Sequence, residues 1–267
     1  MSVAAKNTDG VIFVKTQLSI PPRELVSVIT QTCKKYSSKK YARFSRRLGI
    51  PKSYGVSRPD LRRITKNIIS MVQYGSDEFK ELIFRLGKIN NNEERTIGMM
   101  LLSEIISRNI REALNYSLKE IKHAINNINS WDLADFIGTD IIGPYLAYDA
   151  KNLNEVKKWS KDKNPWIRRI YAVSIWGYFN HTPGISKRKT ERAMAMFNNC
   201  ITDSSKPVKS GTEWSLRNIC KRDWQNCYSH YKFWSKIKDP TVAWIIKKSS
   251  IFMPTKFRKR ILSKIRT

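Results

Sequence analysis

The chain has 267 residues, with 50 Lys and Arg against 22 Asp and Glu, and a formal net charge of +28. A hydrophobic fraction of 41% and eight Trp can form a sizeable core, which excludes a disordered basic tail. A charge excess of this size predicts a polyanionic partner, with nucleic acid as the first candidate and an anionic membrane as its rival.

The same composition argues against a membrane span, a secreted protein and a metal site. No stretch approaches 18 consecutive apolar residues, and the N-terminus lacks the order of a signal peptide. The three His are scattered, and the four Cys show no C-x-x-C and no metal-ligand spacing. There is no Gly-rich phosphate loop. We therefore expect no metal or organic cofactor, no membrane contact, and reduced thiols in a cytoplasmic (nucleoid-associated) or nuclear protein.

In chain order, residues 1–20 show no helical periodicity and are predicted to be a loosely ordered arm. Pro21-Pro22 then begins a helix that runs to about Tyr36. Between Lys34 and Lys66 twelve basic residues stand against one acid, with aromatic residues interleaved: Tyr36, Tyr41, Phe44 and Tyr54. Such a stretch can bind phosphates while its aromatic rings pack or stack. The alternative is an ordinary charged helix face.

The remainder of the chain has the apolar spacing of successive amphipathic helices. The first includes Leu61 and Val72 and is expected to stop at Gly75. The others are predicted at 77–87, 92–107, 117–127, 130–141, 152–160, 165–180, 188–201, 206–222, 224–234, 239–248 and 255–265. Because no segment shows sustained strand alternation, the fold class is all-α, with residues 21–267 in one domain.

A degenerate repeat is visible in these helices. Pro165, Pro207 and Pro240 stand at similar positions in their segments, at spacings of 42 and 33 residues, and Glu94-Arg95 opens an apolar helix in a related way. Proline is suited to the first turn of a helix, and these spacings bracket the period of HEAT-type helical pairs. The repeat predicts a right-handed α-solenoid of HEAT-like repeats with a concave basic groove.

Three segments carry aromatic and charged residues at helical spacing. Trp131 and Asp135 are four residues apart and share a helix face. Trp166 is followed by the double arginine Arg168-Arg169, and Trp214 stands three residues before Arg217. Each has a structural alternative, with the indoles as core, Asp135 as a surface acid and the arginines as salt bridges between repeats.

Together these segments resemble the AlkD-type DNA alkylation repair glycosylases, which are built from HEAT-like repeats. The similarity runs from about residue 54 to 262, and each motif is weak alone. In order, the matching motifs are Tyr54-Gly55-Val56-Ser57-Arg58-Pro59-Asp60-Leu61-Arg62, W-x-x-x-D at Trp131 to Asp135, W-x-x-R-x-x-A at Trp166, Arg169 and Ala172, W-x-L-R at Trp214, Leu216 and Arg217, and the basic Phe257-Arg258-Lys259-Arg260.

The resemblance implies an N-glycosylase that excises cationic N3- or N7-alkylated purines from duplex DNA, without flipping the base and as a monomer. It implies that Asp135 is the catalytic carboxylate, that Trp131 and Trp214 line the cleft, and that Arg169 assists. The implied DNA-binding residues are Arg58, Arg62, Arg168, Lys209, Arg217 and Arg258. Two departures concern the substrate range: Glu213 places a second negative charge near the cleft, and the loop from His181 to Thr190 is longer than usual.

Two other functions are compatible with the charge and the repeats. A non-catalytic HEAT-repeat protein could bind bent, branched or damaged nucleic acid, but it would not need Trp131, Asp135, Arg169 and Trp214 together. A protein-binding scaffold would not need a net charge of +28. The sequence leaves open which alkyl lesion is preferred and whether bulky adducts are accepted.

Overall fold

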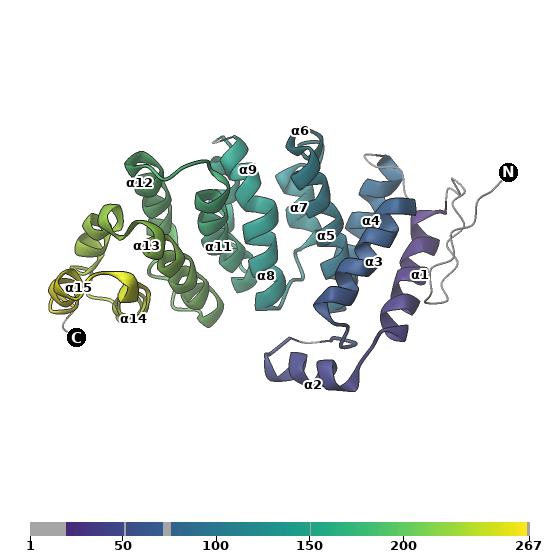
Figure 1. The fold of residues 1–267 in the computed structure, drawn as a ribbon, viewed down its shortest axis with the longest axis horizontal. Coiled ribbons are helices and arrows are strands. Elements are labelled where there is room, and N and C mark those ends of the chain that lie inside the picture. The colour runs from purple at the N-terminus through teal and green to yellow at the C-terminus, as the bar shows by residue number, and fades with distance from the viewer. Residues whose placement is uncertain (1–19, 51, 72–75, 150, 266–267) are drawn as a thin grey trace.

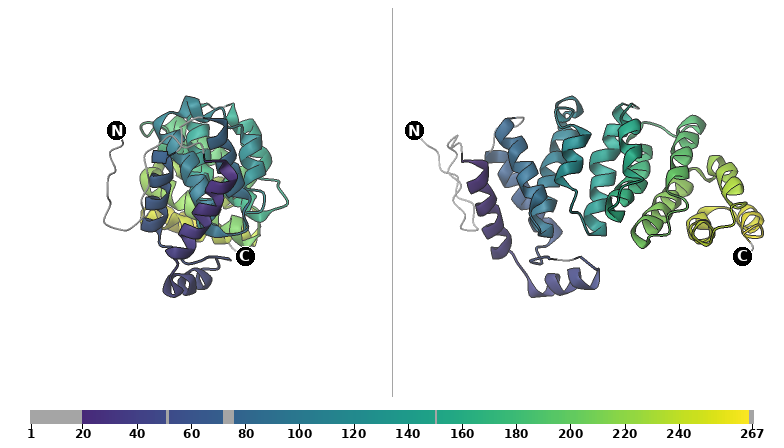
Figure 2. Two further views of the ribbon diagram at one scale, coloured as in Figure 1. Left: turned by 90° about the vertical axis from the view of Figure 1, so that its right-hand side faces the viewer. Right: turned by 180° about the vertical axis from the view of Figure 1, so that it is seen from behind.

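The computed structural model describes residues 20–265, apart from 51, 72–75 and 150. Helices account for most of this part of the chain, and it contains no strand. The helices stand side by side along an elongated row, with α1 and α15 at opposite ends of it (Figures 1 and 2). The all-α solenoid is confirmed. The arm predicted at 1–20 and the stop at Gly75 lie outside the described residues, except for Ile20.

The elements follow in chain order. They are α1 (Pro22–Lys35), α2 (Lys39–Arg47), α3 (Arg58–Met71), α4 (Asp77–Lys88), α5 (Asn92–Arg108), α6 (Ile110–Ala113), α7 (Leu118–Ala124), α8 (Trp131–Ile137), a π-helix (Gly138–Ile142), α9 (Gly143–Tyr148), α10 (Asn152–Trp159), α11 (Pro165–His181), α12 (Lys187–Met196), a 3₁₀ turn (Phe197–Asn199), α13 (Lys206–Trp234), α14 (Pro240–Ser249), a 3₁₀ turn (Ser250–Phe252) and α15 (Thr255–Leu262).

The helices pack as pairs whose members form two layers. In one layer α1, α4, α7 and α10 contact one another in succession, and in the other α3, α5, α8, α11 and α13 do so. We call the second layer the inner layer. Pro165 and Pro207 lie in the first turns of the inner helices α11 and α13, whereas Pro240 begins the helix after α13. The spacing of 42 is therefore one full repeat, and the spacing of 33 is not.

The helix predicted at 130–141 continues to Tyr148 because a π-helical turn and α9 extend α8 without a break. Pro144 has no N–H to give to the preceding turn, and it is accommodated in the first turn of α9. The glycines allow close packing on α11, since a Cβ atom on Gly143 would lie 2.5 Å from the backbone of Gly177. The widened turn and the glycines bring this long helix tightly against α11.

The boundary predicted between 206–222 and 224–234 is confirmed as a kink within α13. Asp223 has non-helical backbone angles (φ −151°, ψ 63°). Its buried carboxylate accepts hydrogen bonds from Thr190 Oγ1 at 2.5 Å and from Asn226 Nδ2. Polar contacts with α12 and with its own next turn therefore fix the kink.

The structure differs from the predicted helices mainly near the N-terminus. α2 was not predicted as a helix, and α3 begins at Arg58 rather than near Leu61. Helices α7, α12 and α15 are shorter than predicted. No helix within the described residues is long and apolar enough to cross a bilayer.

Candidate functional site

Asp135 and Arg169 form a two-pronged ion pair between the inner helices α8 and α11. Arg169 Nε and Nη2 each donate to one carboxylate oxygen of Asp135 at 2.8 Å. The remaining nitrogen, Nη1, donates to the carbonyl of Pro207 at 2.8 Å and to Ser210 Oγ at 2.7 Å, both at the start of α13. The side chains are 19% and 7% exposed. Arg169 thus fixes the Asp135 carboxylate against two neighbouring repeats.

Opposing effects act on the protonation of Asp135. Burial raises the pKa of this carboxyl above the usual value of 3.8, the hydrogen bonds and charge of Arg169 lower it, and the nearby Asp132 adds a small upward contribution. The net direction is upward. Arg169 is therefore the main group that favours the charged form of this partly buried carboxyl.

Trp131 lies one turn before Asp135 on α8, as the spacing predicted, and it is 37% exposed. Its indole N–H donates to the carbonyl of Leu48 at 3.0 Å, directly after α2. The indole is therefore partly exposed to solvent and also joins α2 to the helix that bears the carboxylate.

Trp214 lies one turn after Ser210 on α13, and it is partly buried. The adjacent Glu213 faces another direction. Burial raises its pKa, and the charges that oppose this are Arg217, at 3.2 Å, and Lys248 of α14. The charged residues that act on Asp135 are instead Arg169 and Asp132. The second negative charge expected near the cleft is therefore paired on the α14 side.

A basic hollow lies one repeat before the Asp135–Arg169 pair. Its volume is about 290 Å³, and residues of α3, α5 and α8 line it. One side of the hollow is formed by three basic residues at four-residue spacing on α3, which are Arg58, Arg62 and Lys66. Phe136 of α8 also lines it. Arg58 also makes a 3.4 Å ion pair with Asp132. Arg62 and Lys66 are exposed cations that can face a phosphate backbone.

The other predicted DNA-binding residues fall into two groups. Arg168 bonds within the protein through its whole guanidinium: it pairs with Asp203 at 2.6 Å and donates to three further oxygens, so the structure gives it a role in joining repeats. In the second group, Lys209, Arg217 and Arg258 each make fewer contacts within the protein than Arg168 does. Lys209 lies over the ring of Trp244, and Arg258 donates to a carbonyl of α14.

Helix α2 is the region that sequence reasoning located only as a basic stretch. Five of its nine residues are basic, none is acidic and none is buried. Tyr41 and Phe44 are 46% and 56% exposed. In both figures α2 stands away from the layers, on the side toward which the α14–α15 end also extends (Figures 1 and 2). The apolar spacing of Tyr41, Phe44 and Leu48 was the available signal for this helix.

A buried carboxylate holds the chain that connects α2 to α3. Glu93 accepts hydrogen bonds from Ser53 Oγ at 2.6 Å and from the backbone N–H of Gly55 at 2.9 Å. Gly55 has a positive φ of 85°, and a Cβ atom there would lie 2.3 Å from the backbone N of Ala42. The predicted motif around Tyr54-Gly55 is therefore a tightly held connection that fixes the position of α2. The sequence did not reveal the role of Glu93, because the residues that it binds are distant in sequence.

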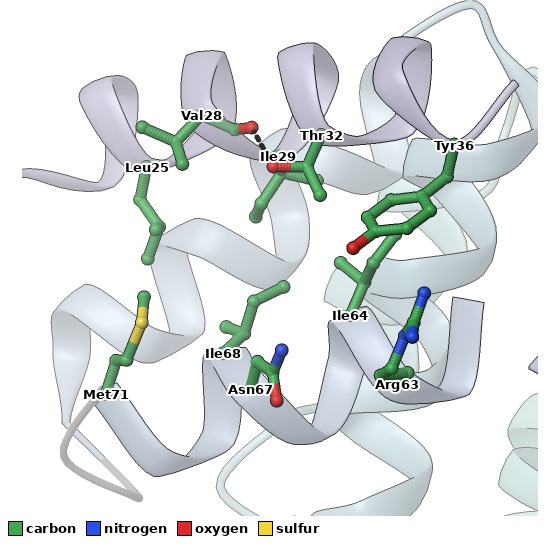
Figure 3. Close-up of a pocket in the computed structure, with 10 residues that line it drawn as sticks. All are labelled: Leu25, Val28, Ile29, Thr32, Tyr36, Arg63, Ile64, Asn67, Ile68 and Met71. Carbon is green, nitrogen blue, oxygen red and sulfur yellow. Dashed lines mark hydrogen bonds between the residues drawn. The ribbon is translucent and has the colours of Figure 1, made fainter. Parts of the chain in front are cut away.

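A second, smaller pocket lies between α1 and α3 (Figure 3). It is mostly apolar and holds about 40 Å³. Tyr36 closes one end of it, with the guanidinium of Arg63 at 4.7 Å from its ring centroid. Tyr36 therefore packs within the protein, unlike Tyr41 and Phe44, and the residues that line this pocket include no Asp, Glu, His or Cys.

Within the described part of the chain, no cluster of three or more His, Cys, Asp and Glu side chains could hold a metal ion. The four Cys are free and buried. The inner helices thus carry a fixed carboxylate, an arginine, one exposed and one partly buried indole, and a basic surface.

These features define a class of protein: an α-solenoid whose inner helices carry an arginine-bound carboxylate together with indoles and basic side chains. The chain belongs to the DNA alkylation repair enzyme family, whose model matches residues 29–230. No curated protein matches it. Among solved structures, the crystal structure of AlkD2 from Streptococcus mutans is similar, with a TM-score of 0.61 and 14% identity over 88% of this chain and 100% of that one.

Proposed function

We propose that the protein is a DNA N-glycosylase that excises cationic N3- or N7-alkylated purines from duplex DNA. Its family is one of DNA alkylation repair enzymes, which supports DNA as the partner. The observation that carries the proposal is the pairing of Asp135 with Arg169, which holds a partly exposed carboxylate on the same helix face as Trp131.

The residues suit a reaction in which the leaving group is already activated. An N3- or N7-alkylated purine carries positive charge and needs little help from a general acid. As the glycosidic bond breaks, positive charge develops on the sugar, as in glycoside hydrolysis. The Asp135 carboxylate stabilises that charge and can orient the attacking water, while the indoles of Trp131 and Trp214 attract a cation to their faces.

Arg169 acts through Asp135 in this proposal. Its two hydrogen bonds use one side of each carboxylate oxygen, and the remaining lone pairs stay available to the substrate. Its third nitrogen is bound to α13, so the carboxylate keeps its place relative to the helix that carries Trp214. Pre-organisation of this kind avoids reorganisation during the reaction.

The DNA is proposed to lie along the inner helices, with α2 as an arm at its side. Basic side chains of α2 and α3 face it, among them Arg62 and Lys66, and the exposed Tyr41 and Phe44 can contact the sugars and bases. We propose that the base is excised without being flipped into a pocket. We propose a cytoplasmic or nuclear monomer.

The test compares two duplexes that differ in one base. One contains N7-methylguanine, which is cationic, and the other O6-methylguanine, which is neutral. Chromatography should detect free N7-methylguanine and an abasic site in the first duplex and no released base in the second. Tight binding without release from either duplex would favour the alternative function, a non-catalytic protein that recognises damaged or bent nucleic acid.

A further inference from the structure

Trp176 on α11 is packed against the candidate site residue Trp214. The ring centroids are 6.3 Å apart and the ring planes are nearly perpendicular, at 85°. The guanidinium of Arg222 lies 5.2 Å from the Trp176 centroid, and the ring of Phe179 lies 6.1 Å away at 24°. The Trp176 indole is therefore restricted by two residues of α13 and by one of its own helix.

Helix α12 supports this arrangement through two adjacent residues. Lys189 Nζ lies 4.4 Å from the Phe179 centroid and donates to the carbonyls of Thr182 and Gly184 in the preceding loop. Burial and the charge of Arg222 lower the pKa of Lys189.

The next residue, Thr190, holds the kink at Asp223. Because Arg222 directly precedes this kink, the position of its guanidinium over Trp176 depends on the same contact. The last two residues of the segment from His181 to Thr190, which lie on α12, thus contribute two of the contacts that hold the aromatic group.

Trp176 is too far along α11 to act on the substrate that Asp135 faces. It follows Arg169 by seven residues, or about 10 Å along the helix axis. Trp214 is nearer to the carboxylate, since Ser210, one turn before it, binds Arg169. A partly buried indole such as that of Trp214 can still turn about two side-chain bonds, and an edge-to-face neighbour restricts that movement.

We propose that Trp176 is a positioning residue that fixes the indole plane of Trp214, and that α12 holds Trp176 in place through Phe179 and Arg222. This proposal rests on the proposed function in one respect, which is that Trp214 contacts the substrate. It assigns no contact with DNA to Trp176 itself.

The experiment uses full-length protein labelled with 5-fluorotryptophan. The Trp214 resonance is identified by its loss in Trp214→Phe. Fluorine NMR and single-turnover release of N7-methylguanine are then measured for Trp176→Ala and Trp176→Phe. Trp224→Ala is the matched control, because Trp224 is likewise a partly buried indole, but it lies on α13 and packs on Phe257, 5.0 Å away.

We expect Trp176→Ala to shift and broaden the Trp214 resonance and to slow release about tenfold, with little change in DNA affinity. Trp176→Phe should restore most of the rate, and Trp224→Ala should leave both readouts near the parent. If Trp176→Ala does not fold, Arg222→Ala tests the same contacts, since its side chain is exposed. It should move the Trp214 resonance by a smaller amount.

An unchanged Trp214 resonance in Trp176→Ala, or in Arg222→Ala where that variant takes its place, would overturn the proposal. It would also be overturned if Trp176→Phe or Trp224→Ala slowed release as much as Trp176→Ala. If the parent protein itself releases no base, the proposed function fails, and the Trp214 resonance alone then decides the positioning role.

Discussion

Replacement of Asp135 by Asn is the change that separates chemistry from structure most sharply. Asparagine has the same shape and its amide oxygen can still accept one hydrogen bond from Arg169, but the negative charge that faces the sugar is lost. A pre-organised electrostatic contribution of this kind is worth on the order of 3–4 kcal/mol, or about 10²–10³ in rate. We therefore expect Asp135→Asn to slow single-turnover release of N7-methylguanine by that factor.

The chain contains a matched control in the neighbouring ion pair. Arg168 and Asp203 also join two repeats, at 2.6 Å, with side chains 20% and 18% exposed. Removal of one partner from a buried pair costs about 3–5 kcal/mol of stability, and less where water reaches the pair. Both Asp135→Asn and Asp203→Asn should therefore lower the Tm, and only Asp135→Asn should also slow release.

DNA affinity gives an independent readout of the same variants. Loss of a negative charge from a surface that binds a polyanion leaves the affinity unchanged or raises it. The reasoning is refuted if Asp135→Asn releases base at the parent rate, or if Asp203→Asn slows release equally. The second result would mean that the acids of both pairs only support the fold.

Four further predictions follow from the same structure. Because burial raises the pKa of Asp135 above 3.8, release should decline as pH falls, starting at a higher pH than an ordinary aspartate would give; a rate that is flat down to pH 4 would contradict this. If six or more phosphates are neutralised, DNA affinity should fall by about 10³-fold or more between 50 and 200 mM salt, with log K linear in log salt. An affinity that does not change with salt would show that the basic side chains do not supply the binding energy. Phe44→Ala, at an exposed position of α2, should weaken DNA binding and leave the Tm unchanged, whereas an unchanged affinity would remove α2 from the interface. Gly177→Ala should cost about 1–3 kcal/mol of stability in denaturant unfolding, since its Cβ would lie 2.6 Å from the Gly138 carbonyl, and an unchanged midpoint would show that the helices can separate without cost.

Local signals in the sequence predicted the helices well. Proline in the first turn located α11, α13 and α14, and the break before 224 was correctly placed at Asp223. α2 was not predicted as a helix because its five basic residues mask the apolar spacing, and none of its residues is buried. The continuation of α8 past Pro144 depends on a π-helical turn packed on α11, which is a tertiary effect.

The residues of the candidate site were predicted less completely than the fold. Arg168 and Arg169 are adjacent and chemically identical, and only packing shows that Arg169 meets Asp135 while Arg168 meets Asp203. Trp176 carries no motif, and its relation to Trp214 arises from the packing of α11 on α13. Which of several similar residues contacts a given distant residue depends on three-dimensional packing, and helical periodicity does not encode it.

The central claim is that the glycosidic bond breaks with positive charge on the sugar, opposite the Asp135 carboxylate. The most direct measurement is the secondary isotope effect at the sugar C1′, obtained from competitive release of N7-methylguanine from duplexes labelled with ¹H or ³H at that carbon. We predict that free base is released and that the ¹H substrate reacts faster, as expected when C1′ becomes cationic before water attacks. No release, or equal rates for the two labels, would contradict the claim.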